Sequence, residues 1–251
     1  MSHFYDPKTG EPKHFVTTKD GSKLRPSTIA DCKKNGWYPG VTTVLNCISK
    51  PGLERWKTTQ NLLAVLTAPD VPGEGIDAKV ERVLSSGQQD EEAAKARTLG
   101  SDLHAGMEAL FSGGRCDEEL RPWIEPAYLE VKKLCPITVY TEFVLVGDGY
   151  AGKSDLIAAV GAYGANNYIV DFKTCKKLPD KAWPEARLQL AAYAKAWQMK
   201  MTCAGDPNTM SVYISTVDAG KFAIFINPPW QKDYEEGFAP LVKHWRWANG
   251  F

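Results

Sequence analysis

Gly152-Lys153-Ser154-Asp155 and Val170-Asp171-Phe172-Lys173 are the two short stretches around which the chain is organised. In the second stretch, Asp171 and Lys173 stand two residues apart in an apolar run. In a β-strand their side chains therefore share one face, while their apolar neighbours point into the core. Asp155 adds a second carboxylate one short connection upstream. Carboxylates hold a hard cation and a lysine offsets charge on a phosphate, so the pattern suits metal-assisted hydrolysis of a phosphodiester.

The residues around these stretches predict a mixed α/β (α+β) fold with a central mixed sheet flanked by helices. Apolar and polar alternation, with Gly-rich turns between the segments, predicts a three-strand meander. Helical periodicity precedes the meander, and Gln189 and Tyr193 share one face of the helix that follows it. The expected strands are 137–146, 150–160, 168–173, 209–216 and 221–226, and the expected helices of this part are 90–111, 119–134, 185–200 and 231–247.

We expect residues 1–90 to form an N-terminal arm with helices that pack on a core of residues 91–251. The arm is rich in Pro, Gly, Lys and Asp, and Asp20-Gly21 indicates a hairpin turn. A helix is predicted to start near Gly40-Val41-Thr42-Thr43, with a threonine as its cap, and to end at Pro51-Gly52. Two further helices are predicted at 53–66 and 73–86.

Composition narrows the class of protein. The 251 residues are 43% hydrophobic and carry 30 basic and 30 acidic side chains, which permits one good core and argues against binding nucleic acid by charge alone. Six cysteines without a Cys-x-x-Cys pair argue against a zinc ribbon or an iron–sulfur site and favour reduced thiols. No apolar run reaches membrane-spanning length and the N-terminus lacks a signal core, so we expect a cytoplasmic protein.

Four spaced motifs together resemble the PD-(D/E)XK nuclease superfamily, in particular its RecB-like branch of phage-type single-chain exonucleases. They are Gly100-x3-His104, Gly152-x-x-Asp155, Asp171-x-Lys173 and Gln189-x3-Tyr193, in the order of that family. The resemblance covers roughly residues 93–200. The chain departs from the family pattern at Ser154, where proline often precedes the first aspartate.

The resemblance implies a metal site and roles for the residues around it. One or two Mg²⁺ or Mn²⁺ ions would be held by Asp155, Asp171, His104 and the backbone carbonyl of Phe172. Taken alone, His104 would more often be an ordinary satisfied histidine. Lys173 would position the attacking water and shield the phosphate. The remaining expected members of the site are Gln189 and Tyr193, which would brace Lys173 or touch the DNA, and Glu142, whose alternative is a structural salt bridge.

Basic residues after Lys173 supply candidate DNA contacts. Lys176, Lys177 and Arg187 could line the path of the phosphates, or could belong to a solvated loop. The segment 41–56 also resembles the N-terminal region of phage exonucleases, which makes Thr42 and Thr43 candidate DNA contacts against the alternative of helix packing. Three tryptophans could stack on bases, namely Trp183, Trp245 and Trp247. Most of the eight tryptophans, however, are expected to pack in the core.

The function implied by the resemblance is a Mg²⁺- or Mn²⁺-dependent DNA exonuclease that leaves 5′-phosphate ends. Its setting would be DNA recombination, repair or phage DNA metabolism in a bacterial or phage-infected host cell. DNA would be its substrate and a single-strand-annealing protein a possible partner. A structure-specific endonuclease of the same fold and a catalytically inactive DNA-binding module are the alternatives.

One motif points elsewhere. Gly147 to Ser154 matches the Gly-x4-Gly-Lys-Ser/Thr phosphate loop of ATP-binding proteins, with Asp171 as a possible second motif. A phosphate loop needs a helix that begins at its Lys-Ser/Thr, so that backbone N–H groups face the phosphates. The short interval between Asp155 and Asp171 leaves room for antiparallel strands and scarcely for a crossover helix. The sequence therefore disfavours an ATP site.

Overall fold

The computed structural model describes residues 3–18, 21–49, 51–85, 91–161, 166–201 and 205–251. Contacts divide the chain into two compact units, one of Met1–Cys47 with Leu103–Phe251 and one of Ile48–Asp102. Residues 1–47 thus belong to the unit that holds the sheet, and the predicted boundary near residue 90 lies inside the second unit.

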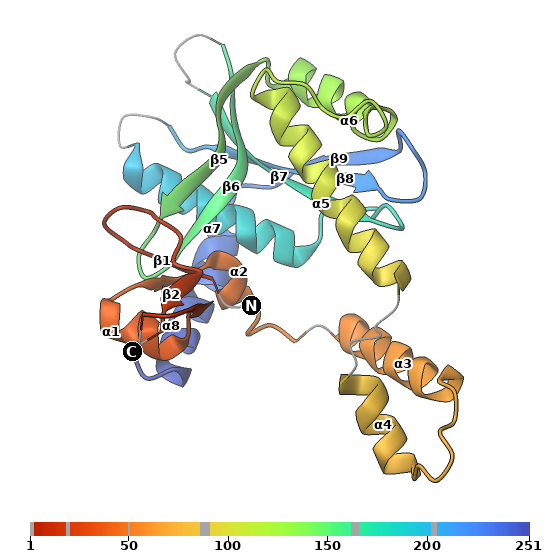
Figure 1. The fold of residues 1–251 in the computed structure, drawn as a ribbon. Helices are drawn as coiled ribbons and strands as arrows, with labels where there is room; N and C mark the ends of the chain where they lie inside the picture. Colours follow the sequence, from red (N-terminus) through yellow and green to blue (C-terminus); the bar gives the residue numbers. More distant parts are fainter. Residues whose placement is uncertain (1–2, 19–20, 50, 86–90, 162–165, 202–204) are drawn as a thin grey trace. The chain divides into compact units, whose positions relative to one another are not determined.

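A five-stranded mixed sheet forms the centre of the first unit (Figure 1). Its spatial order follows the chain order, and only β7 and β8 run parallel; the other neighbours are antiparallel. The antiparallel β5–β6–β7 meander and the mixed sheet confirm the coarse fold prediction. The strands are β5 (Ile137–Val146), β6 (Ala151–Val160), β7 (Asn166–Cys175), β8 (Asn208–Ser215) and β9 (Phe222–Ile226).

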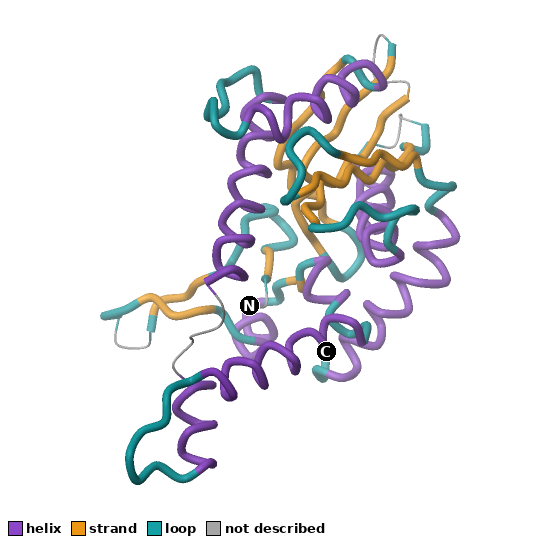
Figure 2. The backbone as a smooth tube through the Cα atoms, turned by 90° about the vertical axis from the view of Figure 1, so that its right-hand side faces the viewer, coloured by secondary structure: helices purple, strands orange, loops and turns teal. Residues whose placement is uncertain are grey.

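Helices cover both faces of this sheet (Figure 2). Consecutive residues of a strand point to opposite faces, and β7 shows which helix covers which face. Asp171 accepts a hydrogen bond from α7 (Pro184–Lys200), whereas the ring of Phe172 stacks on Phe111, which in turn contacts Tyr128 of α6. The centre of the sheet is therefore buried on both sides, and β7 is almost fully inaccessible at its middle.

The helices of residues 91–251 begin and end close to the predicted positions. The long helix α5 (Glu91–Phe111) buries Leu103 and Met107, as its apolar periodicity predicts. The C-terminal helix departs from expectation, because its first part is a π-helix, η2 (Asp233–Phe238). There a Cβ on Gly237 would lie 2.4 Å from Leu188 Cδ2, so the glycine permits close packing on α7. The two remaining helices are α6 (Arg121–Leu134) and α8 (Ala239–Ala248).

The N-terminal segment is more ordered than an irregular arm. Two antiparallel strand pairs form, β1 (Phe4–Tyr5) with β4 (Tyr38–Pro39) and β2 (Phe15–Thr17) with β3 (Leu24–Pro26). The second pair confirms the predicted hairpin, although Asp20 of its turn lies outside the described residues. The segment lies against the sheet, since Gly40 forms an isolated bridge with Ala151 at the start of β6.

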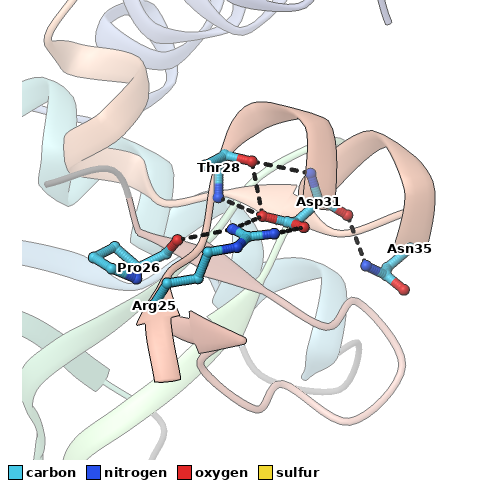
Figure 3. Close-up of polar contacts among 5 residues, drawn as sticks. All are labelled: Arg25, Pro26, Thr28, Asp31 and Asn35. Carbon is cyan, nitrogen blue, oxygen red and sulfur yellow. Dashed lines mark hydrogen bonds and ion pairs between the residues drawn. The ribbon is translucent and has the colours of Figure 1, made fainter. Parts of the chain in front are cut away.

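The short helix α1 (Ile29–Asn35) is closed at its N-terminus by a capping box (Figure 3). The Thr28 hydroxyl accepts from the Asp31 backbone N–H, while the Asp31 carboxylate accepts from the Thr28 backbone N–H at 2.9 Å. Arg25 also grips this carboxylate through two nitrogens at 2.6 and 2.8 Å. These donors, Arg25 first, lower the pKa of Asp31 far below its ordinary value.

The next helix begins differently from the prediction. Helix α2 (Val41–Leu45) has Gly40 as its N-cap, without a side-chain cap, so the predicted threonine cap is wrong. The Thr43 hydroxyl is instead bound to the backbone of His3. Pro51 does not end a helix but begins α3 (Pro51–Thr67), in agreement with the preference of proline for the first helical turn.

The second unit is helical. Within it α3 packs against α4 (Ile76–Ser85), and two ion pairs secure the connection between them. Arg82 binds Glu74 through two nitrogens at 2.7 Å each, and Lys79 binds Asp70 at 2.7 Å. Among the described residues of the whole chain, no helix combines the length and the apolar composition needed to cross a bilayer.

Candidate active site

The site lies where strands β6 and β7 separate. Their recorded ladder starts at Asn166 opposite Val160 and ends at Val170 opposite Leu156. Beyond that point the backbone N–H of Phe172 donates to Asp155 Oδ2 at 2.7 Å. The Asp155 carboxylate thus replaces a ladder acceptor and is held between the two strands.

Asp171 and Lys173 share one face of β7, as their spacing predicts. The Lys173 ammonium lies 2.5 Å from Asp171 Oδ2, and the aspartate is only 1% exposed. That oxygen receives no hydrogen bond of good geometry from the described residues, so the ammonium is what balances its charge. The Asp-x-Lys motif therefore forms an ion pair between a buried carboxylate and a partly exposed lysine, at the point where the two strands separate.

Two side chains of helix α7 lie next to this ion pair. Gln189 donates through Nε2 to Asp171 Oδ1 at 2.9 Å, and the same nitrogen lies 3.4 Å from the Tyr193 hydroxyl. Tyr193 is 3% exposed and rests against the backbone of Gly152, where a Cβ would lie 2.8 Å from its Cε1 atom. Gln189 therefore contacts Asp171, and Tyr193 contacts the backbone of the Gly152 motif.

His104 of helix α5 contacts β7 from the face of the sheet opposite to α7. Its Nε2 atom donates to the Phe172 carbonyl oxygen at 2.6 Å. The two predicted ligands are thus bonded to one another. With its proton moved to Nδ1, the neutral imidazole of His104 could hold a cation together with this carbonyl oxygen.

The charges of the site perturb one another. Burial raises the pKa of Asp155 to about 7, and the Asp171 carboxylate adds to the rise. Burial alone would lower the pKa of Lys173, but the carboxylates of Asp171 and Asp155 outweigh burial and raise it. Burial, with both carboxylates, raises the pKa of Tyr193 well above its ordinary value. Lys173 therefore keeps its proton at neutral pH, whereas Asp155 gains or loses its proton near neutral pH.

A divalent cation fits the chemistry of these groups. No three His, Cys, Asp or Glu side chains of the described residues already form a ready-made ligand set. The fit is instead indicated by a buried carboxylate oxygen, Asp171 Oδ2, whose neighbour is a cation at 2.5 Å. Lys173 stands where another cation could approach this oxygen. Two carboxylates, a carbonyl and an imidazole make a donor set suited to Mg²⁺ or Mn²⁺.

Glu142 lies at the rim of the site and is engaged elsewhere. Thr141 pairs with Leu156 and Phe143 with Ser154, so Glu142 lies opposite Asp155 in the sheet. Its φ of 49° is unusual for a strand residue, and its carboxylate forms an ion pair with Lys153. The salt bridge that was the alternative for Glu142 is thus present.

The phosphate-loop motif does not have the required geometry. Gly152, Lys153 and Ser154 lie inside strand β6, which runs from Ala151 to Val160. No helix begins at Lys153-Ser154, and the ammonium of Lys153 pairs with Glu142. The antiparallel connection expected between Asp155 and Asp171 is confirmed. The match to an ATP-binding loop is therefore a coincidence of letters.

The candidate DNA contacts fall into two groups. Lys176 and Lys177 are exposed just after β7, and Thr42 is exposed on α2. Arg187 is bound through two nitrogens to Asp233 at 2.8 and 2.9 Å, and Thr43 is buried against His3. The first group is exposed, whereas the Arg187 side chain is 34% exposed and paired with Asp233, and Thr43 is buried.

One neighbour of the site was missed by sequence reasoning. Tyr213 of β8 lies beside Lys173, because the two residues are partners in the parallel β7–β8 ladder. The Tyr213 hydroxyl accepts a hydrogen bond at 2.8 Å from the backbone N–H of Trp183. The strand containing Tyr213 was predicted, but its register against β7 depends on tertiary packing.

Comparisons with known proteins add little to this geometry. The chain matches no protein-family model and no curated protein. Among solved structures, one described as "Crystal structure of SSO0001" shares 17% sequence identity, covering 81% of this chain and 70% of that one at a TM-score of 0.36. The likeness is too low to bear on fold or function, so the chemistry of the site follows from its own residues.

Proposed function

We propose that this protein is a metal-dependent deoxyribonuclease with a PD-(D/E)XK core, acting as an exonuclease that leaves 5′-phosphate ends. The observation that carries the proposal is the meeting of Asp155, Asp171 and Lys173 at the point where β6 and β7 separate. Both carboxylates and the ammonium come from neighbouring strands, and Phe172 joins Asp155 to His104 through its own N–H and C=O.

The residues present would hold one or two Mg²⁺ or Mn²⁺ ions through Asp155, Asp171, the Phe172 carbonyl and His104. A bound ion would polarise the phosphodiester and lower the pKa of a water molecule. Asp155, with its pKa raised to about 7, would give up its proton as it became a ligand.

In the protein without metal, the carboxylates of Asp171 and Asp155 raise the pKa of Lys173, so its side chain is protonated at neutral pH. It can donate hydrogen bonds that orient a water molecule, and it can offset the negative charge that develops on the phosphate. Gln189 fixes the carboxylate of Asp171, and Tyr193 packs behind it, so the direction of the Lys173 side chain depends on α7.

The test is digestion of DNA labelled at its ends, alongside a covalently closed circle, with Mg²⁺ and then with EDTA. We expect loss of the linear substrate only, and only with metal. Asp171→Asn and Lys173→Ala should abolish digestion, whereas Lys243→Ala, a change at an exposed lysine of α8, should retain most of it.

Three results would redirect the proposal. Cleavage of the circle would identify an endonuclease instead. DNA binding without any cleavage would identify an inactive binding module. Equal digestion by Asp171→Asn and the unmodified protein would remove this site from the reaction altogether.

A further inference from the structure

Trp183 is an exposed indole at the border of the site. It stands at the N-cap of α7 and remains 37% exposed. Its ring meets the ring of Tyr213 edge to face, with centroids 4.8 Å apart. Because Tyr213 is the ladder partner of Lys173, only one side chain separates Trp183 from the lysine of the site.

The indole is held in place before any ligand arrives. Trp183 precedes Pro184, and a residue before proline is confined to extended conformations; its φ of −65° and ψ of 139° agree. Its backbone N–H is fixed by the hydroxyl of Tyr213, which is itself fully buried. An aromatic surface with so little freedom loses little entropy when a flat ligand stacks on it.

The surroundings indicate what kind of ligand this is. The connection from β7 to α7 carries Lys176, Lys177 and Lys181, all of them exposed. A phosphate chain is attracted by such lysines, and each of its nucleotides offers an aromatic face. The other tryptophans proposed from the sequence differ in position: Trp245 is buried, and Trp247 is 77% exposed on α8.

We propose that Trp183 is a positioning residue, on which one base of a single-stranded DNA end stacks so that its phosphate chain runs past Lys173. The inference rests on the proposed nuclease function and adds to it the way in which the strand is placed. Stacking does not depend on the identity of the base, so the platform would serve a nuclease without sequence preference.

The experiment measures binding of short fluorescent single-stranded oligonucleotides in EDTA, where no cleavage occurs. A series carries one abasic position moved stepwise along the strand. For the unmodified protein we expect one position at which base removal weakens binding about tenfold, the effect of one base–aromatic stack. Trp183→Ala should weaken binding of the intact strand by a similar factor and remove the abasic penalty at that position.

Three further variants separate stacking from structure. Trp183→Phe should keep most of the penalty, and Trp183→Leu, which preserves apolar contact with Tyr213, should lose it at an unchanged melting temperature. Trp247→Ala, an exposed tryptophan away from this connection, should behave like the unmodified protein.

The inference is overturned if the abasic penalty persists in Trp183→Ala and Trp183→Leu, or if the unmodified protein binds no single-stranded DNA. Failure of the nuclease proposal is recognised separately, by absence of Mg²⁺-dependent digestion in the same preparation. An abasic pattern that depends on Trp183 in a protein without digestion would support the platform and reject the nuclease.

Discussion

The backbone N–H of Phe172 donates to the side chain of Asp155 at 2.7 Å, at the first position where strands β6 and β7 no longer pair. A carboxylate held in this way is fixed between two strands. Burial and the nearby Asp171 carboxylate both disfavour its charge, and the pKa of Asp155 rises to about 7.

This shift predicts how stability depends on pH in the absence of metal. The pKa of Asp155 is about 7 in the fold, against an ordinary value of 3.8. Between these values the folded protein holds a proton that the unfolded chain has lost, so the contribution of Asp155 to stability falls as pH rises. We expect the free energy of unfolding of Asp155→Asn, relative to the unmodified protein, to increase by a few kcal/mol from pH 4 to pH 8, since each pKa unit is worth about 1.4 kcal/mol.

Denaturant titrations in EDTA across this range measure the effect. His3 and His14, whose pKa values burial lowers, act in the opposite direction but contribute equally to both proteins. Parallel pH profiles of the two proteins would mean that the carboxyl does not titrate in this window. With Mg²⁺ present, the unmodified protein should instead gain stability as pH rises, because the ion competes with the proton for Asp155.

The local parts of this site could be predicted from the sequence. Spacing places Asp171 and Lys173 on one face of a strand and Gln189 and Tyr193 on one face of a helix, and both placements are observed. Such patterns depend only on the period of a strand or helix. The ends of most elements also fall close to the predictions, because Gly and Pro mark them.

The tertiary parts could not be predicted in the same way. His104 meets Phe172 across 68 residues of chain, and Arg187 meets Asp233 across 46. Neither contact leaves a local signal. The sequence therefore offers Arg187 as a DNA contact or as part of a solvated loop, whereas in the structure it is paired with Asp233. The π-helix in the C-terminal helix, where Gly237 lies against Leu188, is likewise not revealed by periodicity alone.

Because Lys173 pairs with Asp171, replacing the lysine should lower the stability of the metal-free protein and raise its affinity for Mg²⁺. Lys173→Met removes the cation that balances a buried carboxylate, so metal-free stability should fall by about 2–4 kcal/mol. The same change removes a competing cation from Asp171, so Mg²⁺ should raise the melting temperature of Lys173→Met more than that of the unmodified protein. Thermal melts across a Mg²⁺ series measure both effects. The melting temperature of Asp171→Asn should not change with Mg²⁺. If Mg²⁺ raised the melting temperatures of Lys173→Met and the unmodified protein equally, Lys173 would not compete with the ion for Asp171.

Gly152 supplies a test of the packing behind the site. A Cβ at this position would lie 2.8 Å from Tyr193 Cε1 and 3.1 Å from Val41 Cγ2. Gly152→Ala should therefore destabilise the fold by about 1–3 kcal/mol through overpacking. Gly75→Ala is the matched control, because a Cβ there meets nothing within 4 Å. Equal denaturation midpoints for the two variants would show that Tyr193 does not press on the β6 backbone.

The two groups of candidate DNA contacts should separate in the salt dependence of binding. Lys176 and Lys177 are exposed, so alanine at either position should reduce the slope of log affinity against log salt by about 0.7 for single strands. Arg187 is held by Asp233, so Arg187→Ala should leave the slope unchanged and lower stability by about 1–3 kcal/mol. A lower slope for Arg187→Ala would restore the original assignment to DNA.

Glu142 offers the sharpest test of local geometry, because its φ of 49° lies in the left-handed region within a strand. Glycine adopts this conformation freely, whereas an alanine there costs about 1–2 kcal/mol. Both substitutions lose the ion pair with Lys153 equally, so the difference between them isolates the backbone. We expect Glu142→Gly to be more stable than Glu142→Ala by about 1 kcal/mol. At the adjacent Thr141, whose φ is not positive, alanine should be the more stable of the two. If denaturant titrations rank glycine below alanine at both positions, the backbone at Glu142 is an ordinary strand and its side chain is free to turn toward Asp155.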